Sequence, residues 1–264
     1  MQANTNETQF MATLRAALGI KQDNAEKRAA QIFTSPNDPN PEQTGIVETI
    51  KSRQGKDYMG LIDHLCREAV PLKLNVIPVK DEAQVSKAIV ELVKETEPEW
   101  GTKKSVVQWD HPLVNALDLK TALKGQNVPV HTAVFDSAGM DNIKRSKAKE
   151  RVRQQMIDSY IGVTSADFCL ADTATLVMRS RPKEARAVSL LPAIHVAVIR
   201  KEQILTNLKE LYTLLKYDPD TRDPGVLPHH MTMISGPSKT ADIELVMVHG
   251  AHGPRALYLY VITE

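Results

Sequence analysis

Strands and helices alternate along the middle of the chain, and this alternation constrains the fold more than any other feature. Apolar runs of strand length occupy residues 73–79, 104–109 and 128–134, and amphipathic helical stretches occupy residues 81–95 and 112–123 between them. A strand that returns to the same sheet through a helix lies parallel to the first, so this order predicts βαβ units and a mostly parallel sheet. The chain is therefore expected to form an α/β domain.

The second half of the chain supplies further core elements. Periodicity predicts a helix at 151–158, a leucine-rich helix at 201–216, and strands at 176–178, 193–199 and 256–262. Residues 137–150 are polar and rich in Lys and Ser, so we expect a surface loop there. His195 falls within a buried strand, and we interpret it as a hydrogen-bonded core histidine.

The first 45 residues form a separate segment of the sequence. Residues 8–34 show apolar positions at helical spacing, and the run Asn37–Pro41 then interrupts regular structure. We predict an N-terminal helical appendage with a linker over residues 1–45 and an α/β domain over residues 46–264. A helical region is expected to begin at Ile46 and to end before Pro71.

Charge and composition exclude several classes of partner. The 33 Lys and Arg residues nearly balance the 32 Asp and Glu residues, which gives a formal net charge of +1 and no basic footprint for nucleic acid. The longest nearly apolar run, residues 188–199, is too short and too interrupted to span a bilayer. We therefore expect a cytoplasmic protein with a small-molecule or protein partner. Cys66 and Cys169 are too few for an iron–sulfur cluster, so no cofactor is predicted in this chain.

A strand, a glycine turn and a helix start are predicted at residues 231–244. The apolar run Met231–Ile234 ends at the sequence Ser-Gly-Pro-Ser, and residues 240–244 have the composition of a helix start. Open α/β sheets bind ligands where a strand ends in such a turn, and the N–H groups of a helix start favour a carboxylate or phosphate. We therefore predict a small-anion site formed by Gly236, Ser238, Lys239 and Thr240.

A second glycine turn follows at His249–Pro254, directly before the last strand. It places two imidazoles and a guanidinium in one short loop, so His252 and Arg255 are added to the predicted anion site. The three-residue spacing between His249 and His252 favours a loop pair over a metal site, and no metal ligands are predicted.

Two carboxylates are candidates for catalysis. Asp172 lies in a Ser- and Thr-rich segment just before strand 176–178, and Asp242 follows the first glycine turn. A carboxylate beside a strand end can act as a base or nucleophile, whereas its alternative role is to cap a turn. We predict that Asp172 and Asp242 share one cleft with the anion site.

Four motifs follow one another in the second half of the chain: GVTSADFCLADTATLV, SLLPAIHVAVI, ISGPSKTADIE and HGAHGPRALYLYVI. Together they resemble the lactate utilisation protein C family, whose shared unit is the LUD domain, over roughly residues 50–264. The resemblance implies a three-layer α/β/α fold similar to the sugar-phosphate isomerase and CoA-transferase-like superfamily. It also implies a role in oxidising L-lactate to pyruvate together with iron–sulfur subunits, which would carry the clusters.

This chain departs from the family pattern at two glycines and at the glutamate. The usual pattern is close to TGADFAIAETGTLV, whereas Ser165 and Ala174 here replace two glycines and Asp172 replaces a glutamate. The carboxylate is retained but is one methylene shorter. Ser238, Thr240 and Asp242 match the family.

Three functions are consistent with the sequence. The favoured one is a non-cluster subunit of a lactate-oxidising iron–sulfur complex. The alternatives are a stand-alone enzyme that acts on a small anionic metabolite, and a sensor or scaffold without chemistry. The chain has no GxGxxG turn after its first core strand and no P-loop, which argues against nicotinamide chemistry and nucleotide hydrolysis.

Overall fold

The computed structural model describes residues 5–17, 19, 38–98, 101–135, 141–221, 230–241, 247–250 and 252–264. The chain divides into two compact units, Met1–Asn40 and Pro41–Glu264. In the first unit, helix α1 (Thr5–Ala17) is followed by Gly19, which has a positive φ of 64°. Phe10 and Leu14 on α1 are exposed.

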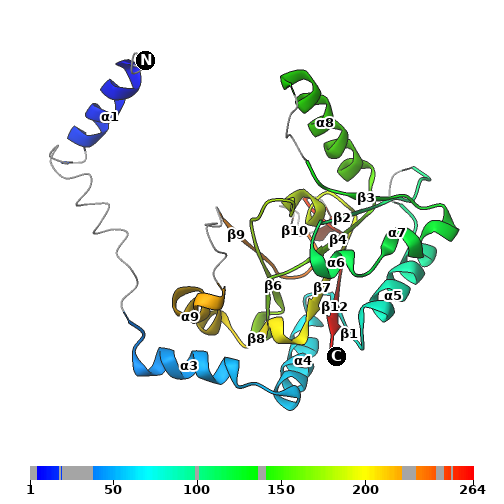
Figure 1. The fold of residues 1–264 in the computed structure, drawn as a ribbon, viewed down its shortest axis with the longest axis horizontal. Coiled ribbons are helices and arrows are strands. Elements are labelled where there is room, and N and C mark those ends of the chain that lie inside the picture. Colours follow the sequence, from blue (N-terminus) through cyan, green and yellow to red (C-terminus); the bar gives the residue numbers. More distant parts are fainter. Residues whose placement is uncertain are drawn as a thin grey trace. The chain divides into compact units, whose positions relative to one another are not determined.

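A six-stranded, wholly parallel sheet forms the centre of the second unit (Figure 1). Its strands lie in the order β1 (Leu74–Val79), β12 (Ala256–Ile262), β7 (Ile194–Arg200), β4 (Ile161–Ser165), β2 (Val106–Gln108) and β3 (Val130–Thr132). The predicted parallel α/β sheet is confirmed, and β1 and β12 fall within one residue of their predicted bounds.

Helices cover both faces of this sheet because its strands are apolar on both sides. On one face, Val196 and Val198 pack with the buried residues of α5 (Glu82–Glu95), α6 (Pro112–Asn115) and α7 (Leu119–Ala122). On the other face, Ala197 and Ile199 pack with Ile62 and Leu65 of α4 (Gly55–Ala69). The short 3₁₀ helices are η1 (Lys124–Gln126), η2 (Ala171–Thr173), η3 (Arg186–Ser189), η4 (Lys201–Gln203) and η5 (Pro219–Thr221).

A second, four-stranded sheet lies on the α4 side and was not expected from the sequence. Its strands lie in the order β8 (Ile204–Leu205), β5 (Phe168–Leu170), β6 (Thr175–Arg179) and β9 (Met231–Ile234). Leu176 and Met178 of β6 join the core of the central sheet, whereas Val177 faces a small outer core. That outer core is closed by α3 (Pro41–Lys51) and α9 (Leu208–Tyr217), which contact each other.

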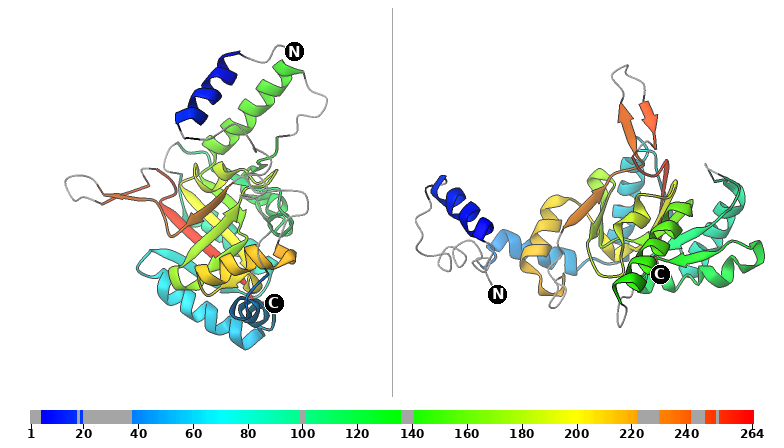
Figure 2. Two further views of the ribbon diagram at one scale, coloured as in Figure 1. Left: turned by 90° about the vertical axis from the view of Figure 1, so that its left-hand side faces the viewer. Right: turned by 90° about the horizontal axis from the view of Figure 1, so that it is seen from above.

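The helix start predicted after the first glycine turn is wrong. Residues Lys239–Ala241 form strand β10, which pairs in antiparallel fashion with β11 (Met247–His249), and Thr240 lies opposite Val248. Both residues are β-branched, which favours a strand pair over a helix. Figure 2 shows that this hairpin stands away from the two sheets.

Three other elements begin five or more residues away from their predicted positions. Helix α8 (Asn142–Asp158) begins nine residues before the predicted position, because the Asp141 side chain caps it by accepting from the Lys144 N–H at 2.8 Å. Helix α9 begins only at Leu208, since Asn207 caps it. Residues 41–45, predicted as linker, belong to α3. Within the described segments, no helix combines the length and the apolar character needed to cross a membrane.

Candidate functional site

Four of the predicted anion-site residues line one cavity, which we call the hairpin cavity. It has a volume of about 440 Å³, and Gly236, Ser238, Lys239 and His252 contribute to its wall. His195 and Leu257, each the second residue of its central strand, also line it. The cavity therefore lies at the amino ends of β7 and β12. Parallel sheets usually bind ligands at their carboxyl ends. Strand β9 lies in the second sheet, where it pairs with β6 in antiparallel fashion, so the reason given for this site from the sequence was wrong.

The first glycine turn is fixed by its contact with the backbone of Leu72. Gly236 has φ +76°, and a Cβ built there would lie 2.7 Å from the Leu72 carbonyl oxygen, so only glycine fits without displacement. The Lys239 ammonium donates to the same carbonyl at 2.9 Å. The Ser238 N–H donates to the Pro254 carbonyl at 2.8 Å. The positive charge of this turn therefore comes from Lys239 and not from the free N–H groups of a helix.

The remaining predicted site residues lie elsewhere or outside the described part of the chain. Arg255 lines a neighbouring cavity of about 780 Å³ with Lys73 and Pro237. Thr240 lies in β10, and Asp242 falls outside the described residues.

Asp172 does not line the hairpin cavity, and its carboxylate instead faces helix α4. Its Oδ1 lies 3.0 Å from Nε2 of His64, whose Nδ1 is 3.9 Å from the Glu68 carboxylate. The Asp172 and His64 side chains are partly exposed, at 40% and 33%. The structure therefore places Asp172 in a carboxylate–imidazole pair at the surface, and its catalytic role stays a prediction.

A chain of hydroxyl groups connects the Asp172 segment with the hairpin cavity. Ser235, which lines the cavity, lies 2.6 Å from the Thr175 hydroxyl, and the Thr175 hydroxyl lies 2.8 Å from that of Thr173. Ala174, between Thr173 and Thr175 in the sequence, is fully buried and has φ +43°, a left-handed conformation that favours glycine. The family pattern described above has a glycine at this position, and the backbone geometry explains why.

His195 is only partly satisfied by hydrogen bonding, which modifies the interpretation made from the sequence. Its side chain is 1% exposed, and its Nε2 lies 2.8 Å from the Thr164 hydroxyl. No described atom pairs with its Nδ1. Burial lowers the pKa of His195 to about 3, so the ring is neutral at pH 7.

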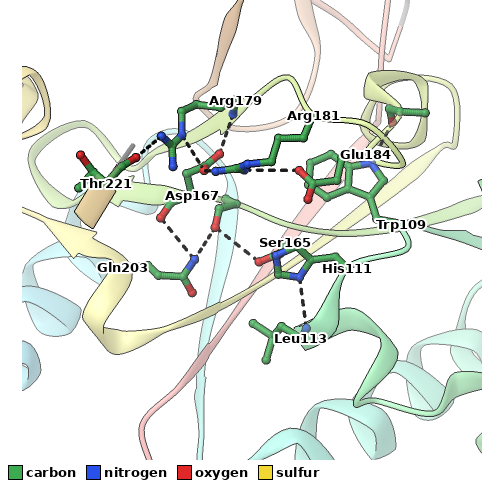
Figure 3. Close-up of polar contacts among 12 residues, drawn as sticks. Trp109, His111, Leu113, Ser165, Asp167, Arg179, Arg181, Glu184, Gln203 and Thr221 are labelled. Carbon is green, nitrogen blue, oxygen red and sulfur yellow. Dashed lines mark hydrogen bonds and ion pairs between the residues drawn. The ribbon is translucent and has the colours of Figure 1, made fainter. Parts of the chain in front are cut away.

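A second polar cluster lies at the carboxyl ends of β2, β4 and β7, and sequence reasoning missed it (Figure 3). Asp167 follows β4 and is 5% exposed. It accepts from the Arg179 N–H at 2.6 Å, from Arg179 Nε at 2.8 Å, and from Arg181 at 2.5 Å. Arg181 also lies 3.5 Å from Glu184. Asp167 thus joins the end of a central strand to the end of β6 in the second sheet.

A cavity of about 340 Å³, the carboxyl-edge cavity, adjoins this cluster, and its lining includes Trp109, His111, Arg181, Glu184 and Gln203. Burial lowers the pKa of His111, Arg181 lowers it further, and Asp167 opposes them. His111 accepts from the Leu113 N–H through Nδ1 at 3.2 Å. The opposite charges of the cluster balance one another, so we interpret it as a clamp between the two sheets.

The two cysteines do not fit a cluster or a metal centre. Cys169 is fully buried, and desolvation strongly raises the pKa of its thiol. Cys66 is partly buried, and desolvation followed by Asp63 raises the pKa of its thiol. Raised thiol pKa values disfavour the thiolate that binds metals. Among the described residues, no group of three or more His, Cys, Asp or Glu side chains is placed to hold a metal ion.

The LUD domain family matches residues 62–262 of the chain. Lactate utilization protein C of Halalkalibacterium halodurans is 31% identical over 159 residues, which cover 60% of this chain and 63% of that protein. Lactate utilization protein C of an Exiguobacterium species is 37% identical over 117 residues, which cover 44% of this chain and 50% of that protein. The chain thus spans less than two thirds of the length of these relatives.

Two further proteins are similar to the chain. Uncharacterized protein YkgG of Escherichia coli K12 is 29% identical over 201 residues, which cover 75% of this chain and 78% of that protein. A crystal structure of a DUF162 family protein from Deinococcus radiodurans aligns with a TM-score of 0.47 and 17% identity, over 80% of this chain and 99% of that chain.

Proposed function

The chain belongs to the LUD domain family, and from this membership we propose that it serves lactate utilisation as a cytoplasmic subunit without a cluster. Its partners would be iron–sulfur subunits that carry the clusters needed to oxidise L-lactate to pyruvate. The observation that carries the proposal is the similarity to several relatives named lactate utilization protein C. The buried Cys169 thiol and the absence of a four-cysteine set support the assignment of the clusters to other chains.

Reconstitution with the iron–sulfur subunits tests this proposal. We expect turnover of L-lactate, measured with an artificial electron acceptor, only in mixtures that contain this chain together with those subunits. The control omits one component at a time. Turnover by this chain alone would reject the subunit assignment and would favour a stand-alone enzyme, and full turnover by the iron–sulfur subunits alone would show that this chain has no part in the reaction.

We further propose that the hairpin cavity binds the small anion on which the system acts. The Lys239 ammonium supplies a full positive charge, and no acidic residue is found among the described residues that line the cavity. This arrangement also supports the alternative function, in which the chain binds a small anionic metabolite as an enzyme or sensor by itself.

Replacement of Lys239 by alanine should weaken binding of a small carboxylate. A charge-assisted hydrogen bond contributes about 1–3 kcal/mol, which corresponds to a loss of roughly 5- to 150-fold in affinity. Titration calorimetry with pyruvate measures the change. The matched control is Lys80→Ala. Lys80 is exposed and directly follows the carboxyl end of β1, away from the hairpin cavity, and its ammonium lies 3.4 Å from the Glu264 carboxylate. Equal affinities for Lys239→Ala and the parent protein would exclude Lys239 from the site.

A further inference from the structure

The neutral ring of His195 lies in the wall of the hairpin cavity, and one of its nitrogens is buried without a partner among the described atoms. Buried polar atoms nearly always have a hydrogen-bond partner, because leaving one unpaired costs free energy. Nε2 has its partner in the Thr164 hydroxyl, and Nδ1 has none among the described atoms. Since His195 is a lining residue of the cavity, the unpaired and buried Nδ1 is the nitrogen that a bound ligand would satisfy.

Taking the proposed anion site as its basis, we propose that Nδ1–H of His195 donates a hydrogen bond to the carboxylate of a small monocarboxylic acid bound in the hairpin cavity. The inference deepens the proposed function by naming a binding residue and the ring nitrogen through which it binds. His195 was assigned only to the core from its sequence context.

The Thr164 hydroxyl makes the required tautomer available. A neutral imidazole carries one proton, so one nitrogen donates and the other accepts. A hydroxyl can donate or accept, and Thr164 can therefore donate to Nε2 while Nδ1 carries the proton. An anion in the cavity selects this tautomer, because only the protonated Nδ1 can donate to it.

The lining of the cavity favours a short carboxylate over a phosphate. Lys239, Ser235 and Ser238 can bind an anionic head group, and they lie on one turn. The same wall also contains apolar residues, namely Leu190, Ile234, Pro237, Pro254 and Leu257. They suit a short carbon chain, whereas a phosphate would lose water there without gaining hydrogen bonds in its place. The neutral His195 adds a donor without adding a charge, which is appropriate for a singly charged ligand.

Two substitutions separate the two nitrogens of the ring. The amide nitrogen of asparagine lies near the position of Nδ1, whereas that of glutamine lies near Nε2. We expect His195→Gln, which keeps the contact with Thr164, to weaken pyruvate binding about tenfold or more. We expect His195→Asn, which keeps the donor toward the cavity, to stay within about threefold of the parent protein. Calorimetry on the full chain measures both, with urea unfolding as the control for folding.

Nitrogen NMR of the full-length parent protein keeps the test decisive if a variant does not fold. Pyruvate at saturation should convert the His195 signals to the Nδ1–H tautomer, and inorganic phosphate at the same concentration should not. Unchanged His195 signals in saturating pyruvate, absence of pyruvate binding, an unaffected His195→Gln variant, or preference for phosphate would each overturn the inference.

These measurements need no partner subunit. Pyruvate binding without reconstituted lactate turnover would reject the proposed function alone, and turnover with unchanged His195 signals would reject this inference alone.

Discussion

Replacement of Gly162 by alanine should lower the free energy of unfolding by about 3–5 kcal/mol, near the upper end for a single substitution. Gly162 lies in β4 between Val107 and His195 on the neighbouring strands. A Cβ at this position would lie 1.9 Å from the Val188 carbonyl oxygen and 2.9 Å from Cγ of Pro192. Neither neighbour is the flexible end of a side chain, so the segment that carries η3 must move away from the sheet.

That movement would spread beyond the substituted strand. The segment holds the indole of Trp109, whose Nε1 donates to the Ala185 carbonyl at 2.9 Å, and it contributes Ser189 to the hairpin cavity. We therefore expect Gly162→Ala to weaken pyruvate binding as well as folding. Urea unfolding followed by circular dichroism gives the stability change, and Trp109 fluorescence in a Trp100→Phe background reports on η3.

Gly60→Ala is the matched control for this substitution. Gly60 lies in the exposed middle of α4, and nothing lies within 4 Å of a Cβ built there. Alanine is the better helix former, so this variant should gain about 0.5–1 kcal/mol. Equal stabilities of Gly162→Ala and the parent protein would mean that η3 does not approach β4 as closely as the structure shows.

The sequence predicts the central sheet well because its signals are local. Apolar runs mark β1, β7 and β12, and the Asp81 side chain begins α5 by accepting from the Gln84 N–H, a role for which aspartate is favoured. Helix α8 was predicted too short because most of it carries no such local signal. Only Met156 of this helix is buried, so most of its length has no apolar stripe from which a helix could be recognised.

The sites were harder to predict because they depend on strand order. Asp167, Arg179 and Gln203 come from the ends of three strands, and only the arrangement of two sheets brings them together. The turn Ser235–Ser238 was recognised as special, but its contact with Leu72 is made across more than 160 residues. The signal available for the missed cluster was the rule that parallel strands present their carboxyl ends at one edge.

Replacement of Asp167 by alanine should lower the free energy of unfolding by about 3–5 kcal/mol, because it removes one partner from a buried ion pair. The carboxylate accepts from Arg179 at two positions and from Arg181, and the Arg179 side chain is only 10% exposed. Without Asp167, the largely buried Arg179 guanidinium lies beside that of Arg181, which keeps Glu184 as a partner. Asp167→Asn keeps the shape of the side chain and part of its hydrogen bonding, so this variant should lose less free energy of unfolding.

An exposed aspartate in the same part of the fold separates this effect from a general loss of charge. Asp220 is 80% exposed and lies 3.0 Å from Lys51, which also contacts Asp218 at 2.7 Å. Since exposed pairs contribute little and Lys51 keeps its second partner, Asp220→Ala should change stability by less than about 0.5 kcal/mol. Urea unfolding of the three variants side by side gives the order expected for a clamp between the sheets: Asp220→Ala most stable, Asp167→Asn intermediate and Asp167→Ala least stable. If Asp167→Ala were as stable as Asp220→Ala, the Asp167 cluster would have no structural role, and its place beside the carboxyl-edge cavity would then favour a role in ligand binding.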